Sequence, residues 1–351
     1  MVNVIFKNIE RNKGFLPFDD YMEMSLYDPD AGYYMSRHPK IGKEGDFYTT
    51  SSVSKLYGVL VARWFIKKTE TGEIPPVFCE AGSGTGKFIR AFLEEWEKQS
   101  PDSYKEGKVF CIEKSPYHSL RLQHLNVSIL SSLSELPDEF SGVIFSNELF
   151  DAMPVKLVEM DNGQPVEIGV GTDDHGSLVF KQKEGKQDYL IAQYLEWSGI
   201  KLQEGYRAEV PLAMLCMLEE MNHKMRDAYV ITADYGHFSE QLNTRREGTI
   251  RGFKNHTLIS NPLAYPFEMD LTYDIPLDVY LKKTGEFGWQ DISVQKQSDF
   301  FWGNGLSDFL EDTYDPNPFS GTAKQNRAIR SLLSQEGMSE SFYIMIHKKR
   351  G

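Results

Sequence analysis

The stretch Val77–Gly86 constrains the fold of this chain more than any other. It begins as a short apolar run, passes an acid and then places Gly82, Gly84 and Gly86 at alternate positions. An apolar run that ends in glycines predicts a buried strand followed by a tight turn. Residues 87–99 carry apolar side chains at helical spacing, which predicts an amphipathic helix after the turn. Such a strand, turn and helix form a nucleotide-type site, since glycines admit a ligand close to the backbone and a helix N-terminus offers free N–H groups.

The spacing of the glycines indicates which class of ligand the turn binds. Lys87 stands where a dinucleotide fingerprint needs its third glycine. Ala81 and Phe88 stand where a phosphate loop needs its first glycine and its magnesium-binding hydroxyl. The pattern Glu-x-Gly-x-Gly-x-Gly instead resembles motif I of class I S-adenosylmethionine (AdoMet) methyltransferases, whose turn wraps around the methionine part of AdoMet. A plain turn between a strand and a helix is the alternative, so other parts of the chain must agree.

The composition of the chain limits which binding partners and which cellular location we expect. The chain has 351 residues, of which 40% are hydrophobic, and a net charge of −13. This charge argues against nucleic-acid binding, which depends on clustered Lys and Arg. The absence of a signal-peptide pattern and of a long apolar run leads us to expect a cytoplasmic protein without membrane insertion. We expect no metal site, and we expect Cys79, Cys111 and Cys216 to be buried small residues, because cysteines and histidines lack ligand spacing.

The second and third predicted strands carry candidate cofactor contacts at their ends. Residues 108–112 form an apolar run that ends at Glu113, and an acid in this place binds ribose hydroxyls in nucleoside-binding α/β folds. A surface acid at a strand end is the alternative. Residues 127–130 predict the third strand, after which Ser132 and Leu133 occupy the usual place of the adenine contacts.

The fourth predicted strand, residues 142–146, leads into a polar run with Asn147, Glu148 and Asp151. In an open parallel sheet the chemistry lies at the carboxyl ends of the strands. Two carboxylates in this place can hold a guanidinium through bidentate, charge-assisted hydrogen bonds. The alternative is that Asp151 caps a turn and Glu148 is solvated.

The predicted fold is an α/β, Rossmann-like, seven-stranded and mostly parallel sheet whose last strand is antiparallel. Residues 1–70, rich in aromatic residues and turn formers, form an N-terminal cap with a helix that follows Ser51 or Ser52. Residues 71–155 and 226–351 form the cofactor-binding domain. Residues 156–225 form an insertion of a β-hairpin and a helix. Residues 237–270 are polar and are expected to be loop-like.

Seven segments occur in an order that resembles the MidA family of class I AdoMet methyltransferases, which includes a mitochondrial complex I assembly methyltransferase. They are Tyr27–Tyr34, Gly45–Thr50, Glu80–Gly86, Asn147–Pro154, Glu204–Glu209, Asp234–Gly236 and Arg251–Phe253. The resemblance runs from about residue 15 to about residue 310. It implies an AdoMet-dependent methyltransferase and, for the mitochondrial members, methylation of an arginine on a protein.

These observations lead to a set of expected roles. Glu148 and Asp151 are the expected catalytic residues, which hold the acceptor. The expected cofactor-binding residues are Phe47, Glu80, Gly82, Gly84, Gly86, Glu113, Ser132, Leu133 and Asn147. Phe47 or Tyr48 is expected to close the site against water. Two alternatives to protein methylation stay open, namely an AdoMet-binding assembly factor without turnover and a small-molecule methyltransferase.

Overall fold

A computed structural model describes residues 2–35, 51–185, 188–255, 257–309, 317, 320–333 and 341–351. The chain divides into two compact units, and neither unit is continuous in sequence. The first unit combines the N-terminal segment with Phe150–Glu219 and Gly236–Glu286. The second unit combines the segment that ends at Leu149 with Glu220–Tyr235 and Phe287–Gly351.

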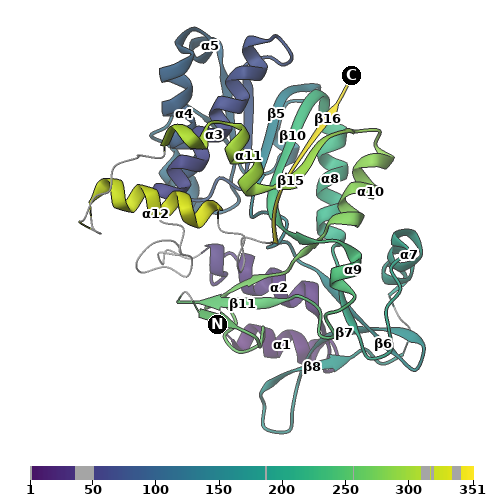
Figure 1. Ribbon diagram of the computed structural model, residues 1–351. Helices are drawn as coiled ribbons and strands as arrows, with labels where there is room; N and C mark the ends of the chain where they lie inside the picture. The colour runs from purple at the N-terminus through teal and green to yellow at the C-terminus, as the bar shows by residue number, and fades with distance from the viewer. Residues whose placement is uncertain are drawn as a thin grey trace. The chain divides into compact units, whose positions relative to one another are not determined.

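The second unit is built on a seven-strand path of one sheet. Its strands are β2 (Val77–Ala81), β3 (Lys108–Ile112), β4 (Ser128–Leu130), β5 (Phe140–Asn147), β10 (Met225–His237), β15 (Gln290–Lys296) and β16 (Phe342–Lys349). They lie in the order β4-β3-β2-β5-β10-β16-β15, and Figure 1 shows β5, β10 and β16 side by side. The first five are parallel, whereas β16 is antiparallel to both of its neighbours. The predicted mostly parallel sheet with a reversed last strand is therefore confirmed.

Aromatic side chains from two long helices fill the core of the second unit. The helices of this unit are α3 (Ser51–Glu70), α4 (Lys87–Gln99), α5 (Pro101–Glu106), α6 (Pro116–Leu122), α11 (Gln297–Gly303) and α12 (Gly321–Leu333), with 3-10 turns at Leu133–Glu135 and Leu306–Phe309. Phe78 of β2 stacks on Phe92 of α4 with ring centroids 4.0 Å apart. A Cβ at Gly58 of α3 would lie 2.7 Å from the Phe88 carbonyl oxygen, so this glycine allows α3 and α4 to pack closely.

The first unit contains two antiparallel sheets. One has the order β1-β7-β6-β9, with β8 paired to β7, and the other has the order β12-β11-β13. The strands are β1 (Leu16–Pro17), β6 (Lys156–Asp161), β7 (Gln164–Thr172), β8 (Leu178–Gln182), β9 (Arg207–Val210), β11 (Arg251–Lys254), β12 (Thr257–Ile259), β13 (Asp270–Thr272) and β14 (Ile275–Pro276). The helices are α1 (Asn3–Arg11), α2 (Phe18–Tyr27), α7 (Tyr189–Ser198), α9 (Ser239–Leu242) and α10 (Leu277–Glu286), while α8 (Leu212–Lys224) crosses the boundary of the units.

Three features differ from the sequence-based expectations. The units divide the chain elsewhere than the predicted domains do, because α3 packs on α4 and because β1, from the predicted cap, pairs with β7 of the predicted insertion. The polar residues 237–270 are not simply loop-like, since short strands too brief for a clear periodic pattern pair there. Cys216 is exposed on α8, whereas Cys79 and Cys111 are buried in the sheet as expected.

Candidate functional site

The glycine turn joins β2 to α4 in the second unit. Gly82, Gly84 and Gly86 have φ angles of 77°, 50° and 75°, in the left-handed region that favours glycine. A Cβ at Gly86 would lie 2.6 Å from a methyl carbon of Leu122, whereas a Cβ at Gly84 would meet no atom within 4 Å. Packing therefore requires Gly86, while the space where a side chain of residue 84 would stand is open to a ligand.

Glu113 directly follows β3 and binds the glycine turn. Its Oε2 accepts a hydrogen bond from the Gly84 N–H at 2.6 Å, and its Oε1 accepts one from the Ser115 N–H at 2.7 Å. Burial raises the pKa of Glu113, and the two backbone donors oppose this shift. The structure thus brings together two of the residues expected at the cofactor. It also gives Glu113 a role that its sequence position did not predict, since its carboxylate holds the turn.

Buried polar atoms without partners gather at the carboxyl ends of β2 and β5. Glu80 Oε2, Ser146 Oγ and Asn147 Oδ1 accept or donate no hydrogen bond within the described residues. The two strands are neighbours, with Ala81 opposite Ser146. Burial raises the pKa of Glu80 well above its ordinary value. Because buried polar atoms are normally bonded, this edge of the sheet fits a ligand with several polar groups.

Glu148 follows β5 in a backbone conformation that is rare for a residue with a side chain. Its φ angle is 48°, its N–H donates to the Ala233 carbonyl at 2.9 Å, and its Oε1 accepts from Asn147 Nδ2 at 3.2 Å. Strained non-glycine residues of this kind cluster at functional sites.

Tyr57 of α3 is a polar residue that sequence reasoning missed at this edge. Burial raises the pKa of its hydroxyl well above the ordinary value, and the charges of Glu148 and Asp234 add to that shift. The hydroxyl has no hydrogen-bond partner in the described part of the chain. Tyr57 occupies an apolar-stripe position of its helix, so the periodic pattern carried no signal for a polar role.

The remaining expected cofactor contacts have simpler surroundings. Leu133 is buried at the start of a 3-10 turn after β4, and the hydroxyls of Ser132 and Ser134 lie 2.6 Å apart. Phe47 and Tyr48, which were expected to close the site, fall outside the described residues.

Asp151, the second expected catalytic residue, belongs to the first unit, whereas Glu148 belongs to the second. Its Oδ2 accepts a hydrogen bond from Thr272 Oγ1 at 2.8 Å, and its carbonyl oxygen accepts from the Tyr273 N–H at 3.1 Å. Burial raises the pKa of Asp151 to about 6, against the opposing effects of Thr272 and Arg251. The carboxylate of Asp151 is therefore bonded to β13, and its backbone carbonyl is bonded to the residue that follows β13.

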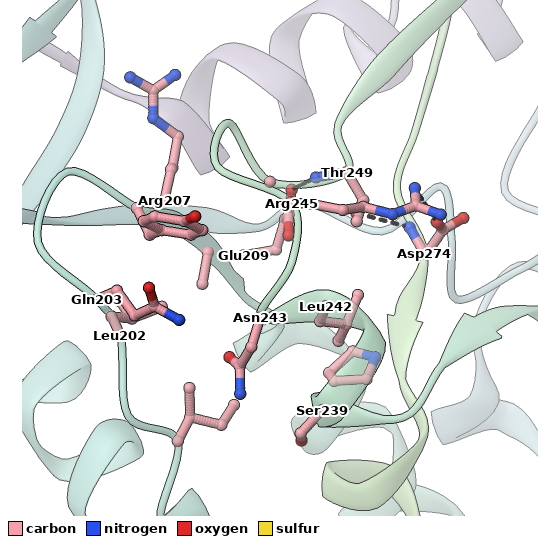
Figure 2. A pocket seen from close by; sticks show the side chains of 15 residues that line it. Leu202, Gln203, Arg207, Glu209, Ser239, Leu242, Asn243, Arg245, Thr249 and Asp274 are labelled. Atoms are coloured by element: carbon pink, nitrogen blue, oxygen red, sulfur yellow. Dashed lines mark hydrogen bonds and ion pairs between the residues drawn. The ribbon is translucent and has the colours of Figure 1, made fainter.

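A dense ionic cluster, the Asp274 cluster, lies in the first unit. Asp274 is 3% exposed and pairs with Arg251 at 2.8 Å and with Arg245 at 2.9 Å. His237 Nε2 lies 2.8 Å from a guanidinium nitrogen of Arg245. A cavity of about 30 Å³ lies beside this cluster. Figure 2 shows the side chains that line it. Arg251 lies in one of the seven segments that resemble the MidA family, but no sequence pattern indicated its ion-pair partners.

The sheet order and the glycine turn define the class of protein, because together they form the class I methyltransferase fold. Two crystal structures from Burkholderia thailandensis share this fold. One, solved with S-adenosyl-homocysteine bound, has a TM-score of 0.87 and 24% identity and covers 99% of this chain and 91% of that one. The other, a native structure, has a TM-score of 0.83 and 25% identity over the same shares of the two chains.

A family model described as "Putative S-adenosyl-L-methionine-dependent methyltransferase" matches residues 60–287. The chain belongs to this family of AdoMet-dependent methyltransferases, as the MidA resemblance implied. A relative from Drosophila melanogaster, named a mitochondrial protein arginine methyltransferase NDUFAF7 homolog, is 28% identical over 303 residues. That match covers 75% of this chain but 65% of the relative, so the chain spans slightly less than two thirds of that protein. The Bos taurus protein arginine methyltransferase NDUFAF7 is 25% identical, with 88% and 75% covered.

The names of the relatives correct one prediction. They describe mitochondrial proteins, which contradicts the expected cytoplasmic location.

The family confirms the prediction that the cofactor is AdoMet. The residues of the second unit fit this cofactor, since there is open space beside Gly84 and since Glu80 Oε2, Ser146 Oγ and Asn147 Oδ1 are buried without a hydrogen-bond partner among the described residues. Within the described ranges, no helix is both long enough and apolar enough to cross a membrane.

Proposed function

We propose that this methyltransferase transfers the methyl group of AdoMet to an arginine side chain of a protein. Relatives that match 75% to 95% of the chain are named protein arginine methyltransferases. The observation that carries the proposal is Glu148, a carboxylate placed by a strained backbone directly after β5, the strand end where chemistry occurs in such sheets. A carboxylate is the group that binds a guanidinium best.

Several residues of the second unit are proposed to hold the cofactor. Gly82, Gly84 and Gly86 admit the methionine part to the backbone, and Asn147 binds its polar end. Glu80 carries a buried oxygen without a partner and supplies a counter-charge for the ammonium group. Glu113 binds the ribose hydroxyls, and Ser132 and Leu133 contact the adenine. When bound, AdoMet supplies a methyl group that its sulfonium activates toward nucleophiles.

A protonated arginine is a poor nucleophile, so the protein has to orient the guanidinium and assist the loss of its proton. Glu148 holds the guanidinium in line with the methyl group, and alignment alone lowers the barrier by several kcal/mol. The same carboxylate, beside the buried Tyr57 and Asp234, favours loss of the guanidinium proton at or after transfer. Asp151 is also proposed as a catalytic residue, since burial raises its pKa to about 6 and so lets it take up a proton near neutral pH.

The test is a methyl-transfer assay with labelled AdoMet and a cell extract, followed by hydrolysis and identification of the labelled residue. We expect the label in methylated arginine with the native chain and little label with Glu148→Gln. Glu94→Gln, an exposed change on α4, is the matched control and should retain activity.

The two alternatives give different results in the same assay. Label recovered only in small molecules would identify a small-molecule methyltransferase. Binding of AdoMet without transfer of label to any fraction would identify an assembly factor without turnover. Either outcome would overturn the proposal.

A further inference from the structure

The cavity of the first unit is a second candidate binding site, and neither the family nor the sequence motifs assign it a role. Its volume of about 30 Å³ holds a few atoms of the size of a water molecule. Ile200, Leu202, Leu242 and Pro276 give it a partly apolar wall. Polar groups enter from the residues around β9 and α9, and all the lining residues belong to the first unit.

The charged residues that line the cavity are not equivalent. Arg207 donates from Nη2 to Glu159 Oε2 at 2.8 Å, and its guanidinium lies over the Phe180 ring at 4.4 Å. Figure 2 shows this guanidinium turned away from the cavity. Arg245 donates to Asp274 at 2.9 Å. Both cations of the lining are therefore neutralised by other carboxylates.

Glu209 is the lining charge that lacks a cation. It is 7% exposed, and its Oε1 accepts hydrogen bonds from the Thr249 N–H at 2.5 Å and the Ile250 N–H at 2.9 Å. In the described part of the chain no residue forms an ion pair with it, and no other residue donates a hydrogen bond to Oε2. Burial raises the pKa of this carboxyl, and a cation in the cavity would stabilise its ionised form.

Two carboxamides complete the recognition groups. Figure 2 shows the side chains of Gln203 and Asn243 pointing into the cavity. Their oxygens can accept hydrogen bonds from an N–H donor that approaches Glu209. The cationic end of a ligand that enters the cavity would then meet acceptors together with an apolar wall, the usual organisation of a small-ligand pocket.

We propose that this cavity binds a protonated amine or guanidinium at the end of an aliphatic chain, with Glu209 as its counter-charge. Lysine and arginine side chains of a polypeptide carry this chemistry, and so do free polyamines. The inference concerns binding alone and does not rest on methylation of arginine. Its failure would leave the proposed transfer reaction untouched, and failure of that reaction would leave this site untouched.

The experiment is a ligand-observed NMR titration of the full chain without AdoMet. The probes are N-acetyl-lysine methylamide, its neutral isostere N-acetyl-norleucine methylamide, and the diamine cadaverine. We expect the lysine amide to bind with a Kd of about 1 mM and the norleucine amide at least about tenfold more weakly, since a single ionic contact with few other groups gives affinity of this order. Cadaverine distinguishes the sources, because tighter binding of cadaverine than of the lysine amide would assign the site to free amines.

Two variants test the residues. Glu209→Gln should weaken lysine-amide binding at least about tenfold, the loss of one charge-assisted contact. Gln203→Ala should weaken lysine-amide binding about threefold. Because the Gln203 side chain supports no secondary structure, this variant tests the proposed site even if Glu209→Gln fails to fold. Gln123→Ala, an exposed change in the second unit, is the control and should bind normally. Equal affinity for the charged and neutral amides, no saturable binding of either amine, or native affinity in Gln203→Ala would overturn the inference.

Discussion

Two buried glutamates, one in each unit, use the same contacts to different ends. Glu113 of the second unit and Glu209 of the first each accept two backbone hydrogen bonds, and burial raises the pKa of both. In Glu113 one carboxylate oxygen accepts from the Gly84 N–H and the other from the Ser115 N–H. In Glu209 both backbone N–H groups donate to the same oxygen, Oε1. The first arrangement fixes a turn at the cofactor edge. It leaves one lone pair on each oxygen for further donors, whereas the second leaves a whole oxygen of Glu209 available to the cavity. Donor geometry therefore decides how the remaining acceptor capacity of each carboxylate is divided between its oxygens.

The largest expected effect comes from a substitution at Gly84 of the second unit that fills the space beside its backbone. Gly84→Val places a β-branched side chain at a φ of 50° and into the space left for the ligand. We expect AdoMet affinity to fall by at least about a thousandfold, or about 4 kcal/mol, measured by isothermal titration. Gly163 of the first unit also has a positive φ and open surroundings, so Gly163→Val is the matched control. Similar loss of AdoMet binding in both variants would show that general strain, and not the site, is responsible.

The next effect concerns the two carboxylates that sequence analysis paired. We expect Glu148→Gln to lower kcat by about a thousandfold with little change in AdoMet affinity, the range seen when a general acid or base is lost. Asp151→Asn in the first unit should act in the same direction. Steady-state kinetics with titration of AdoMet for each variant would measure both. Loss of cofactor binding in both variants, or full activity in both, would exclude a role at the acceptor.

Two buried groups, His347 in the second unit and Asp151 in the first, should make contributions to stability that respond to pH in opposite directions. Burial lowers the pKa of His347 in the second unit from 6.5 to about 4, so the unfolded chain alone binds a proton between these values and stability falls as pH falls. Burial raises the pKa of Asp151 in the first unit from 3.8 to about 6, so stability falls as pH rises through that window. Each shift corresponds to about 3 kcal/mol.

Denaturant unfolding of variants across pH 4 to pH 6.5 separates the two effects. His347→Phe should remove the loss on the acidic side, and Asp151→Asn should remove the loss on the alkaline side. A pH profile of His347→Phe that matches the native profile would contradict the assignment to this buried ring.

The smallest effect tests the two glutamates directly. Glu113→Gln keeps the size of the side chain but weakens its hydrogen bonds to the Gly84 N–H and to the ribose, so the Kd for AdoMet should rise about tenfold. Hydrogen exchange of the Gly84 amide should also become faster. Glu209→Gln loses the matching contacts in the first unit and should leave AdoMet affinity unchanged. Equal Kd values for native chain and Glu113→Gln would remove Glu113 from the cofactor site.

The sequence alone determined the strands and helices of much of the second unit, because the apolar patterns and glycines there are strong local signals. The apolar run before Gly82 predicted the buried strand β2, and the stripe in residues 87–99 predicted α4 with its observed bounds. The positions of Glu113 and Glu148 followed from the strand ends that precede them. These features depend on neighbours within a few residues, which periodicity and glycine spacing report well.

Only the tertiary structure decided which distant residues meet. The pairing of β1 with β7, the contact of Glu209 with residues 249 and 250, and the salt bridges of Asp274 join segments far apart in the chain. The hydroxyl of Tyr57 among carboxylates was hidden for the same reason, since its helical spacing marks it as core. Side-chain patterns record which face of an element is buried, but not which partner covers it, because that choice depends on long-range packing.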